Sequence, residues 1–493
     1  MLTEEMKQII NSNDKHMAII AFAGAGKSST MLEYIKQRPN EKILFLVYNK
    51  EMQREFSSRV RNIQHNSTIS TIHSFAFRWY VRRYGKKNFK NISSLDVKKI
   101  LKTKGLEFGD LCLIKFYYDM FLCSDKETPY ELQLISNEHS RLMKYVERLF
   151  DYYKNESDTI QHNVYLKLFQ LSKDKISGYD TIIVDEFNDI NECMLSIVVN
   201  NMDKKIICVG DPLQNLNSFN YTIDGLNKVI EDYGFKQYNL TMSFRISEEV
   251  ASLSSRYLTY MYDKNIKFHG NKTTKFGKVD FKNCNPNNKI TLLCRNRLGG
   301  LVEAMNIIKN YPNKKIYYVG GLNAFGLEEI ERLISYRGYV YIGGEKFHIS
   351  TLRNMLEDEE VQDAEIRRIV SLYSFGQKEE NNKLFPLLRY TETTNKDEAD
   401  IIVQTAHSSK GLTVSNVYLA GDFAPIEDLK KDMLEMKSRG NEYMYNVSKS
   451  EINLIYVALT RATEIIDMNE VLNRKDKQDK SKRIEVVLDN RKI

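Results

Sequence analysis

Residues 17–30 read MAIIAFAGAGKSST, and this stretch decides the fold. Its first five residues are apolar and predict a buried parallel strand that ends at Ala21. Small residues at 23–26 let backbone N–H groups approach phosphate oxygens, and a helix that begins at Lys27 adds the partial positive charge of its N-terminus. The stretch therefore predicts a phosphate-binding loop, although Ala21 stands where the strict pattern has glycine. The alternative is an ordinary glycine turn between strand and helix.

The side chains of this loop predict a nucleotide site. Lys27 is expected to reach the β- and γ-phosphates, and the hydroxyl of Ser28 is expected to ligate Mg²⁺. The residues expected to contact the bound nucleotide are Gly24, Ala25, Gly26, Lys27, Ser28 and Ser29.

An acidic pair follows a later apolar strand, which we expect at residues 179–184. Asp185 is expected to hold Mg²⁺, and Glu186 is expected to orient and deprotonate an attacking water molecule. The next strand, 205–210, leads to Gln214, which can sense the γ-phosphate. Acidic pairs also follow strands by chance, but the phosphate loop upstream favours the catalytic interpretation.

Polar residues also follow two strands expected at 42–50 and 67–72. Because ligands gather at the carboxyl ends of parallel strands, these residues should share one rim with the phosphate loop. They are Tyr48, Asn49, Lys50, Thr71 and His73. A lone histidine after a strand is more often structural, so the position of His73 on this rim is what favours a functional role.

The composition is that of a chain with two or more ordinary globular domains. It has 493 residues, of which 42% are hydrophobic and 28% charged. The net charge of +7 permits a nucleic-acid partner without requiring one. The six cysteines are scattered and are expected to be reduced core residues, not metal ligands. There is neither an 18-residue apolar run nor a signal-peptide layout, so we expect a cytoplasmic protein that is not secreted and not bound to a membrane.

Segments outside the first sheet divide the chain further. Residues 78–90, RWYVRRYGKKNFK, interleave cations with aromatic rings and are consistent equally with nucleic-acid contact and with a solvated helix end. Residues 92–170 are expected to be mostly helical. After residue 250 a second α/β pattern begins, without a phosphate loop of its own, and it is interrupted by a helical, charged stretch at 322–388. The C-terminal tail is rich in Lys, Arg and Asp residues.

These features predict an α/β fold of two domains, each with a helical insertion. The first domain is expected at 1–85 and 168–250, with its insertion at 86–167. The second is expected at 251–321 and 389–470, with its small insertion at 322–388. A charged C-terminal tail is expected at 471–493.

The ordered set of motifs resembles the UvrD/Rep-like superfamily 1 helicases, and within them the F-box helicase branch, although no F-box precedes the motifs. The segments that carry the resemblance are AFAGAGKS (21–28), LVYNK (46–50), TIHSF (71–75), DEFND (185–189), GDPLQNLNSF (210–219), LTMSFR (240–245), TAHSSKGL (405–412) and NLIYVALTRA (453–462). Each motif alone is weak, but all of them in family order are a strong signal.

The resemblance implies a motor of two RecA-like lobes that bind ATP and Mg²⁺ between them and move 3′ to 5′ along single-stranded DNA. By motif match, Arg245 and Arg461 are arginine fingers on the γ-phosphate, and Phe244 stacks on the adenine. The residues implied to contact DNA are Asn49, Lys50, Thr71, His73, Phe75, Phe219, Thr405 and His407. A 3′-tailed duplex is the expected substrate.

The chain departs from the family pattern at several positions. Met6 stands where the family has a glutamine that reads adenine, and Asn188 stands in place of the glutamine of the second motif. Asn217 and Asn220 replace an aromatic residue and an arginine, and Thr413 replaces a glutamate. These differences bear on adenine selectivity, on coupling between the lobes and on the grip on DNA.

Three functions therefore remain open from the sequence. The leading one is an ATP-dependent DNA helicase. The second is a translocase that strips proteins from DNA but unwinds poorly. The third is an ATP-switched DNA-binding subunit that acts with a protein partner in a larger nuclease, recombination or defence complex. RNA remains a possible substrate for each of them.

Overall fold

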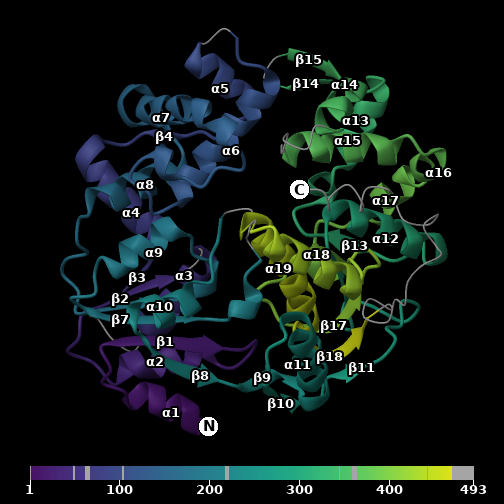
Figure 1. Ribbon diagram of the computed structural model, residues 1–493. Helices are drawn as coiled ribbons and strands as arrows, with labels where there is room; N and C mark the ends of the chain where they lie inside the picture. The colour runs from purple at the N-terminus through teal and green to yellow at the C-terminus, as the bar shows by residue number, and fades with distance from the viewer. Residues whose placement is uncertain are drawn as a thin grey trace. The chain divides into compact units, whose positions relative to one another are not determined.

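The computed structural model describes residues 2–47, 50–61, 67–102, 105–216, 221–342, 345–357, 364–440 and 442–468. The chain forms two compact units, Met1–Thr241 and Met242–Ile493. Each unit is built around a parallel sheet (Figure 1). Some residues named above lie outside the described residues, namely Tyr48, Asn49, Asn217, Phe219, Asn220 and the tail 471–493.

The sheet of the first unit has the strand order β3-β2-β6-β7-β1-β8, and neighbouring strands pair in parallel (Figure 1). All five residues of β2 and all four of β6 are buried, so both faces of the sheet are covered there. The strands are β1 (His16–Ala21), β2 (Ile43–Val47), β3 (Ser67–Thr71), β6 (Thr181–Val184), β7 (Lys205–Gly210) and β8 (Lys236–Leu240).

Side chains cap some helices of this unit, among them α4 (Ile72–Tyr84) at Thr71 and α9 (Glu192–Val199) at Asn191. Helix α1 (Glu4–Asn11) is capped by Thr3, whose hydroxyl accepts from the N–H of Met6. Helix α2 (Lys27–Lys36) follows the loop after β1. The other helices next to the sheet are α3 (Lys50–Arg61), α4, α9 and α10 (Gly225–Tyr233).

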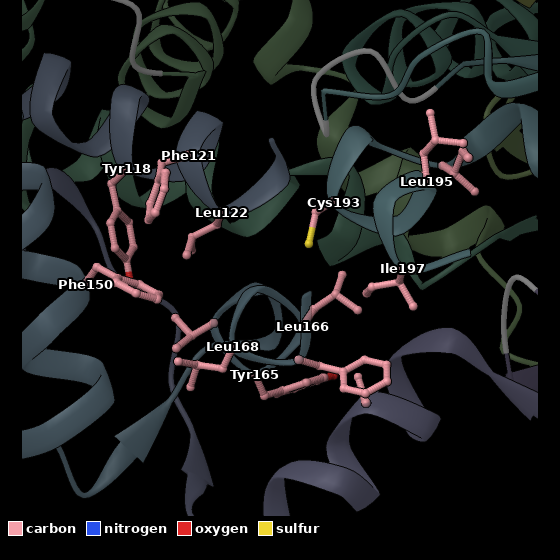
Figure 2. Packing of buried hydrophobic residues seen from close by; sticks show 14 of the residues in the cluster. Tyr118, Phe121, Leu122, Phe150, Tyr165, Leu166, Leu168, Cys193, Leu195 and Ile197 are labelled. Carbon is pink, nitrogen blue, oxygen red and sulfur yellow. The ribbon is translucent and has the colours of Figure 1, made fainter. Parts of the chain in front are cut away.

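The expected helical insertion of the first unit is present. It contains α5 (Ser94–Leu101), α6 (Phe108–Cys123), α7 (Met143–Asp151) and α8 (His162–Ser172), with a short pair of strands, β4 (Asn88–Phe89) and β5 (Thr159–Ile160), that was not predicted. Figure 2 shows Leu122, Leu166 and Cys193 in the packed core around these helices. The same cluster of buried residues includes Leu44 and Ile182 of the sheet, so the insertion and the sheet share one core.

The second unit contains a similar parallel sheet, with strand order β11-β18-β17-β12-β16-β13. The strand β18 follows the last long helix and was not predicted. The strands are β11 (Lys275–Phe276), β12 (Ile290–Cys294), β13 (Ile316–Tyr318), β16 (Ile401–Thr405), β17 (Val414–Leu419) and β18 (Ala462–Asp467). Strand β9 (Met242–Ser247) pairs separately with β10 (His269–Lys272).

Helices accompany this second sheet: α11 (Glu248–Tyr262), α12 (Arg297–Asn310), α18 (Ile426–Ser438) and α19 (Glu442–Leu459). The insertion contains the expected helices and also an unpredicted antiparallel hairpin of β14 (Tyr339–Ile342) and β15 (Glu345–His348). Its helices are α13 (Leu327–Ser335), α14 (Ile349–Glu357), α15 (Ala364–Gly376), α16 (Glu379–Asn382) and α17 (Phe385–Thr391).

All six cysteines are buried and free of disulfide bonds. Among the described helices none is long and apolar enough to cross a membrane.

Candidate functional site

The loop between β1 and α2 has the backbone expected of a phosphate-binding loop. Gly24 and Gly26 both have positive φ values, 74° and 81°, which glycine adopts at little cost. Gly26 occupies the position before the first turn of α2 and has no side chain to cap it. The N–H groups of that turn are therefore suited to bind an anion. The hydroxyl of Thr30 donates to the carbonyl of Gly26 at 3.0 Å and fixes the turn from within.

Lys27 forms an ion pair with the acidic pair after β6. Its Nζ lies 2.7 Å from Oε1 of Glu186, and both side chains are largely buried, at 15% and 11% exposed. Burial acts to lower the pKa of Lys27, but the charges of Glu186, Asp185 and Asp211 outweigh it and raise that pKa. Lys27 therefore stays cationic among three carboxylates, as a phosphate-binding lysine must.

Asp185 and Glu186 leave β6 at the carboxyl edge of the sheet. The backbone N–H of Asp185 donates to Leu46 of the neighbouring strand, so the sheet positions the residue. One carboxylate oxygen of Asp185 accepts from the N–H of Glu186 at 3.0 Å. Glu186 itself has φ = 51°, in the left-handed region that costs a residue with a Cβ some free energy. Such conformations cluster at functional sites, where the surroundings hold them.

A buried hydrogen-bonded group joins the ends of β6 and β7. Oδ1 of Asn188 accepts from the N–H of Asp211 at 3.0 Å, and Nε2 of Gln214 donates to Oδ2 of Asp211 at 2.8 Å. Gly210 has to be glycine here, because a Cβ would lie 2.4 Å from Oδ1 of Asn188. Gln214, predicted as a γ-phosphate sensor, is thus tied to a carboxylate whose charge acts on Lys27.

Asp211 is a member of this site that the sequence reasoning did not single out. It is fully buried, and its charge reaches Lys27. The signal that could have found it was present, because Asp211 follows a strand whose carboxyl end meets the same rim.

The site offers oxygen ligands of the kind Mg²⁺ prefers. Mg²⁺ is usually held by one or two protein oxygens together with substrate phosphates and water. The hydroxyl of Ser28, in the first turn of α2, and the carboxylate of Asp185 meet that requirement. Among the described residues there is no cluster of three or more His, Cys, Asp or Glu side chains arranged for a metal ion.

The two predicted arginine fingers belong to the second unit and lie near one another. Nη1 of Arg245 and Nη2 of Arg461 contact the carbonyl and the hydroxyl of Thr460, at 3.4 and 3.0 Å. Arg461 is buried and also donates to the carbonyls of Val457 and Leu412. Arg245 lies inside β9, as does Phe244, and both side chains are half-buried.

Two threonines predicted to contact nucleic acid have the same local structure in the two units. Oγ1 of Thr71 accepts from the N–H of Ser74 at 3.0 Å at the end of β3, and Oγ1 of Thr405 accepts from the N–H of Ser408 at 3.2 Å at the end of β16. Both stretches have the sequence T-x-H-S. The capped turns place His73 and His407 at the carboxyl edges of the two sheets.

His73 and Phe75 face the first insertion. Nδ1 of His73 lies 3.2 Å from the hydroxyl of Tyr165, and the ring of Phe75 packs 5.8 Å from that of Phe169. Burial and the neighbouring His162 lower the pKa of His73 to about 4. The ring is therefore neutral at pH 7 and can offer a hydrogen bond or a stacking face, not a charge. Lys50 is exposed at the start of α3.

The basic and aromatic stretch 78–90 is used mainly for packing. Nε1 of Trp79 donates to Asp174 at 2.7 Å, Arg83 pairs with the same carboxylate, and Tyr80 is buried. The ring of Phe89 remains 47% exposed and stacks on His162, with centroids 4.3 Å apart.

A second acidic group, which is partly buried, lies at the carboxyl edge of the sheet in the second unit, and the sequence reasoning missed it. Asp422 accepts from the N–H groups of Arg295 and Asn296 at 2.9 and 3.0 Å. Burial raises the pKa of Asp422 to about 6, although these two hydrogen bonds act to lower it. Arg295 in turn makes a two-pronged pair with Glu451, at 2.6 and 2.8 Å. Together they fix the turn between β12 and α12.

Comparison with known proteins agrees with this geometry. Residues 2–234 match the family model described as UvrD/REP helicase N-terminal domain. F-box DNA helicase 1 of Gallus gallus is 28% identical over 96% of this chain and 49% of the relative. F-box DNA helicase protein 1 of Schizosaccharomyces pombe is 25% identical over 96% of this chain and 58% of its own length. A probable DNA helicase II homolog of Mycoplasma capricolum is 24% identical over 95% of this chain and 71% of its own length.

The chain therefore spans about half the length of the first two of these relatives. The resemblance inferred from the motifs is confirmed, and so is the predicted fold class of two RecA-like α/β units with insertions. Residues 2–234 are thus similar to the UvrD/REP helicase N-terminal domain, and the chain as a whole is similar to F-box DNA helicases over most of its length.

Proposed function

We propose that the chain is an ATP-dependent DNA helicase that moves 3′ to 5′ on single-stranded DNA. The observation that carries the proposal is the ion pair of Lys27 with Glu186, set among Asp185 and Asp211 at the end of a glycine loop. The similarity to proteins named DNA helicases supplies the class of substrate.

The chemistry follows from where the charges lie. Nucleotide phosphates would compete with Glu186 for the ammonium of Lys27, because three phosphate oxygens present more negative charge than one carboxylate. Once released from Lys27, Glu186 can accept the proton of the attacking water. Mg²⁺, held by Ser28 and Asp185, would offset charge on the phosphates.

Gln214 and Asp211 couple this site to its surroundings in the proposed mechanism. Their hydrogen bond lies at the end of β7, next to Asn188. When phosphates bind beside Lys27, the negative charge that they bring alters the electric field at Asp211. We propose that Gln214, which donates to Asp211, moves in response. Arg245 and Arg461 are proposed to stabilise the charge that develops on the γ-phosphate during transfer.

The nucleic-acid path is proposed to follow the carboxyl edges of the two sheets. Lys50, Thr71, His73 and Phe75 are its residues in the first unit, and Thr405 and His407 are those in the second. Asn49 and Phe219 are kept as proposed contacts from their motifs alone. A sequence-blind motor needs phosphate contacts and stacking faces, which these residue types supply.

The decisive test is steady-state ATPase activity with and without single-stranded DNA, followed by unwinding of duplexes that carry either a 3′ or a 5′ tail. We expect stimulation by DNA and unwinding from the 3′ tail only. Unwinding from the 5′ tail would refute the direction. Stimulation without unwinding would replace the helicase proposal by a translocase or a partner-dependent switch, and stimulation by RNA alone would change the substrate.

A further inference from the structure

The hairpin of the second insertion has two chemically different faces. Its register pairs Tyr339 with His348 and Tyr341 with Lys346, and these four residues therefore share one face. The alternate pairs, Val340 with Phe347 and Ile342 with Glu345, belong to the other face. Val340 and Phe347 are half-buried, so that face is turned toward the protein.

The first face carries large aromatic side chains in solvent. Tyr341 is 71% exposed and Tyr339 is 43% exposed, and Tyr336, just before the hairpin, is 62% exposed. Soluble proteins often expose single aromatic residues, but here three exposed tyrosines lie within six positions of the sequence, and two of them share one face of the hairpin. The phenol rings are rigid and lose little conformational entropy when a partner binds.

The helix before the hairpin holds this face in place. Helix α13 ends with the N–H of Gly338 bonded to the carbonyl of Leu333 at 2.8 Å, while Arg337 and Gly338 both have positive φ values. The N–H of Ile349 then bonds to the carbonyl of Gly338 at 2.9 Å and closes the base of the hairpin. A Cβ on Gly338 would lie 2.8 Å from the ring of Tyr373, so the base packs closely on α15.

Cations accompany the rings. Nζ of Lys346 lies 4.2 Å from the centroid of the Tyr339 ring, and Lys346 is exposed. Arg337 is exposed beside Tyr336. Nδ1 of His348 lies 2.7 Å from the hydroxyl of Ser350 and accepts from the N–H of the same residue at 3.2 Å.

We propose that this face of the β14–β15 hairpin binds single-stranded nucleic acid, with unpaired bases stacked on Tyr339 and Tyr341 and backbone phosphates held by Lys346 and Arg337. The inference rests on the proposed nucleic-acid motor and adds a contact in the second insertion to it. Rigid aromatic platforms combined with cations are the features by which proteins bind single strands without reading sequence. A duplex keeps its bases stacked internally and offers these rings no free face.

The test uses the full chain, a fluorescein-labelled oligothymidylate and anisotropy titration. The double variant Tyr339→Ala/Tyr341→Ala should bind at least about fivefold more weakly, the lower end of what stacking of one base contributes. Tyr339→Phe/Tyr341→Phe keeps both rings and should bind within about twofold of the wild type. Tyr390→Ala removes a tyrosine that is 77% exposed on α17 and is the matched control.

The salt dependence separates phosphate contacts from stacking. Lys346→Ala should reduce the slope of log affinity against log salt by about 0.7, the value for one phosphate contact on a single strand. Each variant is checked by thermal unfolding, and we expect little change because the substituted rings are exposed.

The wild-type titration distinguishes the two possible failures. If wild-type protein does not bind the oligonucleotide and its ATPase is not stimulated, the proposed function fails. If wild-type protein binds but the alanine pair binds equally well, or loses affinity only for duplex DNA, the hairpin proposal is overturned while the motor proposal stands.

Discussion

Nζ of Lys27 lies 2.7 Å from Oε1 of Glu186, although the two residues follow strands that are not neighbours in the sheet. Strand β7 lies between β1 and β6, and Asp211 at its end contributes to the field on Lys27. The site is thus assembled from three strand ends. The contribution of each strand end can be tested by a substitution, and the expected result differs from one strand end to the next.

Replacement of Lys27 by alanine should abolish ATPase activity while leaving binding to single-stranded DNA largely intact. The variant loses the cation that faces the β- and γ-phosphates, and it leaves Asp185, Glu186 and Asp211 without their shared counter-charge. Steady-state phosphate release and anisotropy measure the two effects. Lys36→Ala, on the exposed part of the same helix, is the control. Turnover retained in Lys27→Ala would disprove the nucleotide site.

Glu186→Gln should bind ATP but hydrolyse it on the order of 10² to 10⁴ times more slowly, because the amide cannot accept the proton of the attacking water. Retention of labelled ATP on the protein, compared with single-turnover hydrolysis, measures this. Glu33→Gln, at a surface ion pair of α2, should leave both unchanged. Unaltered turnover in Glu186→Gln would remove Glu186 from the role of base.

Arg461→Ala should lower the turnover number on the order of 10³-fold or more if Arg461 contacts the γ-phosphate in the transition state. Because the side chain is buried and donates to the carbonyls of Val457 and Leu412, the variant should also lose about 1–3 kcal/mol of stability. Turnover is therefore compared with urea unfolding, with the exposed Arg439→Ala as control. A loss of stability with less than about tenfold loss of turnover would assign Arg461 a purely structural role.

Gly210→Ala should impair ATPase activity without touching any nucleotide-binding residue. The new Cβ would lie 2.4 Å from Oδ1 of Asn188, which must then move away from the N–H of Asp211. Gly277→Ala is a matched change, because the nearest atom to its Cβ is 3.9 Å away. We expect Gly210→Ala to lower both the unfolding midpoint and turnover, and Gly277→Ala to lower neither. Equal behaviour of the two variants would refute the steric argument.

The stability of the first unit should fall on acidification, in part through His73. Burial and His162 hold its pKa at about 4, below the ordinary 6.5. Between these values the unfolded chain binds more protons, so the contribution of the neutral ring is complete above pH 6.5 and is lost as pH falls toward 4. His73→Gln should reduce the difference in unfolding free energy between pH 7 and pH 5 by on the order of 1 kcal/mol.

The sequence could predict those parts of the fold whose signal is local. Apolar runs followed by polar residues correctly indicated β1, β6, β7, β12 and β16, because buried parallel strands are apolar on both faces. The rule that ligands gather at the carboxyl ends of such strands was enough to bring Lys27, Asp185 and Glu186 together. Thr3 as the cap of α1 was likewise visible, since capping depends on neighbouring residues only.

What the sequence did not predict depends on contacts between distant residues. Strand β18, ATEIID, has no continuous apolar run and becomes a strand because β11 and β17 lie on either side of it. The environment of His73 is set by Tyr165 and His162, which follow it by about ninety residues.

The β14–β15 hairpin is a different case. A local sequence signal for it was present, but the helical pattern of the surrounding residues outweighed that signal. Two alternating runs, YVYI and EKFH, flank Gly343-Gly344, a typical hairpin sequence. The charged, helical character of the surrounding stretch favoured helix instead. In a sequence-based prediction, the pattern of a short strand with mixed composition is weaker than the pattern of the long amphipathic helices around it.

The pairing of β1 has a consequence for folding of the chain during its synthesis on the ribosome. Met17 pairs with Ile207 on one side and with Lys236 on the other. At ordinary rates of translation, roughly 10 to 45 s pass between synthesis of the strand and of its second neighbour. Through that interval the apolar strand that leads to the phosphate loop has no native partner on its outer edge. Nascent chains that end before residue 236 should therefore depend on chaperones and aggregate when released, whereas chains that extend past β8 should not.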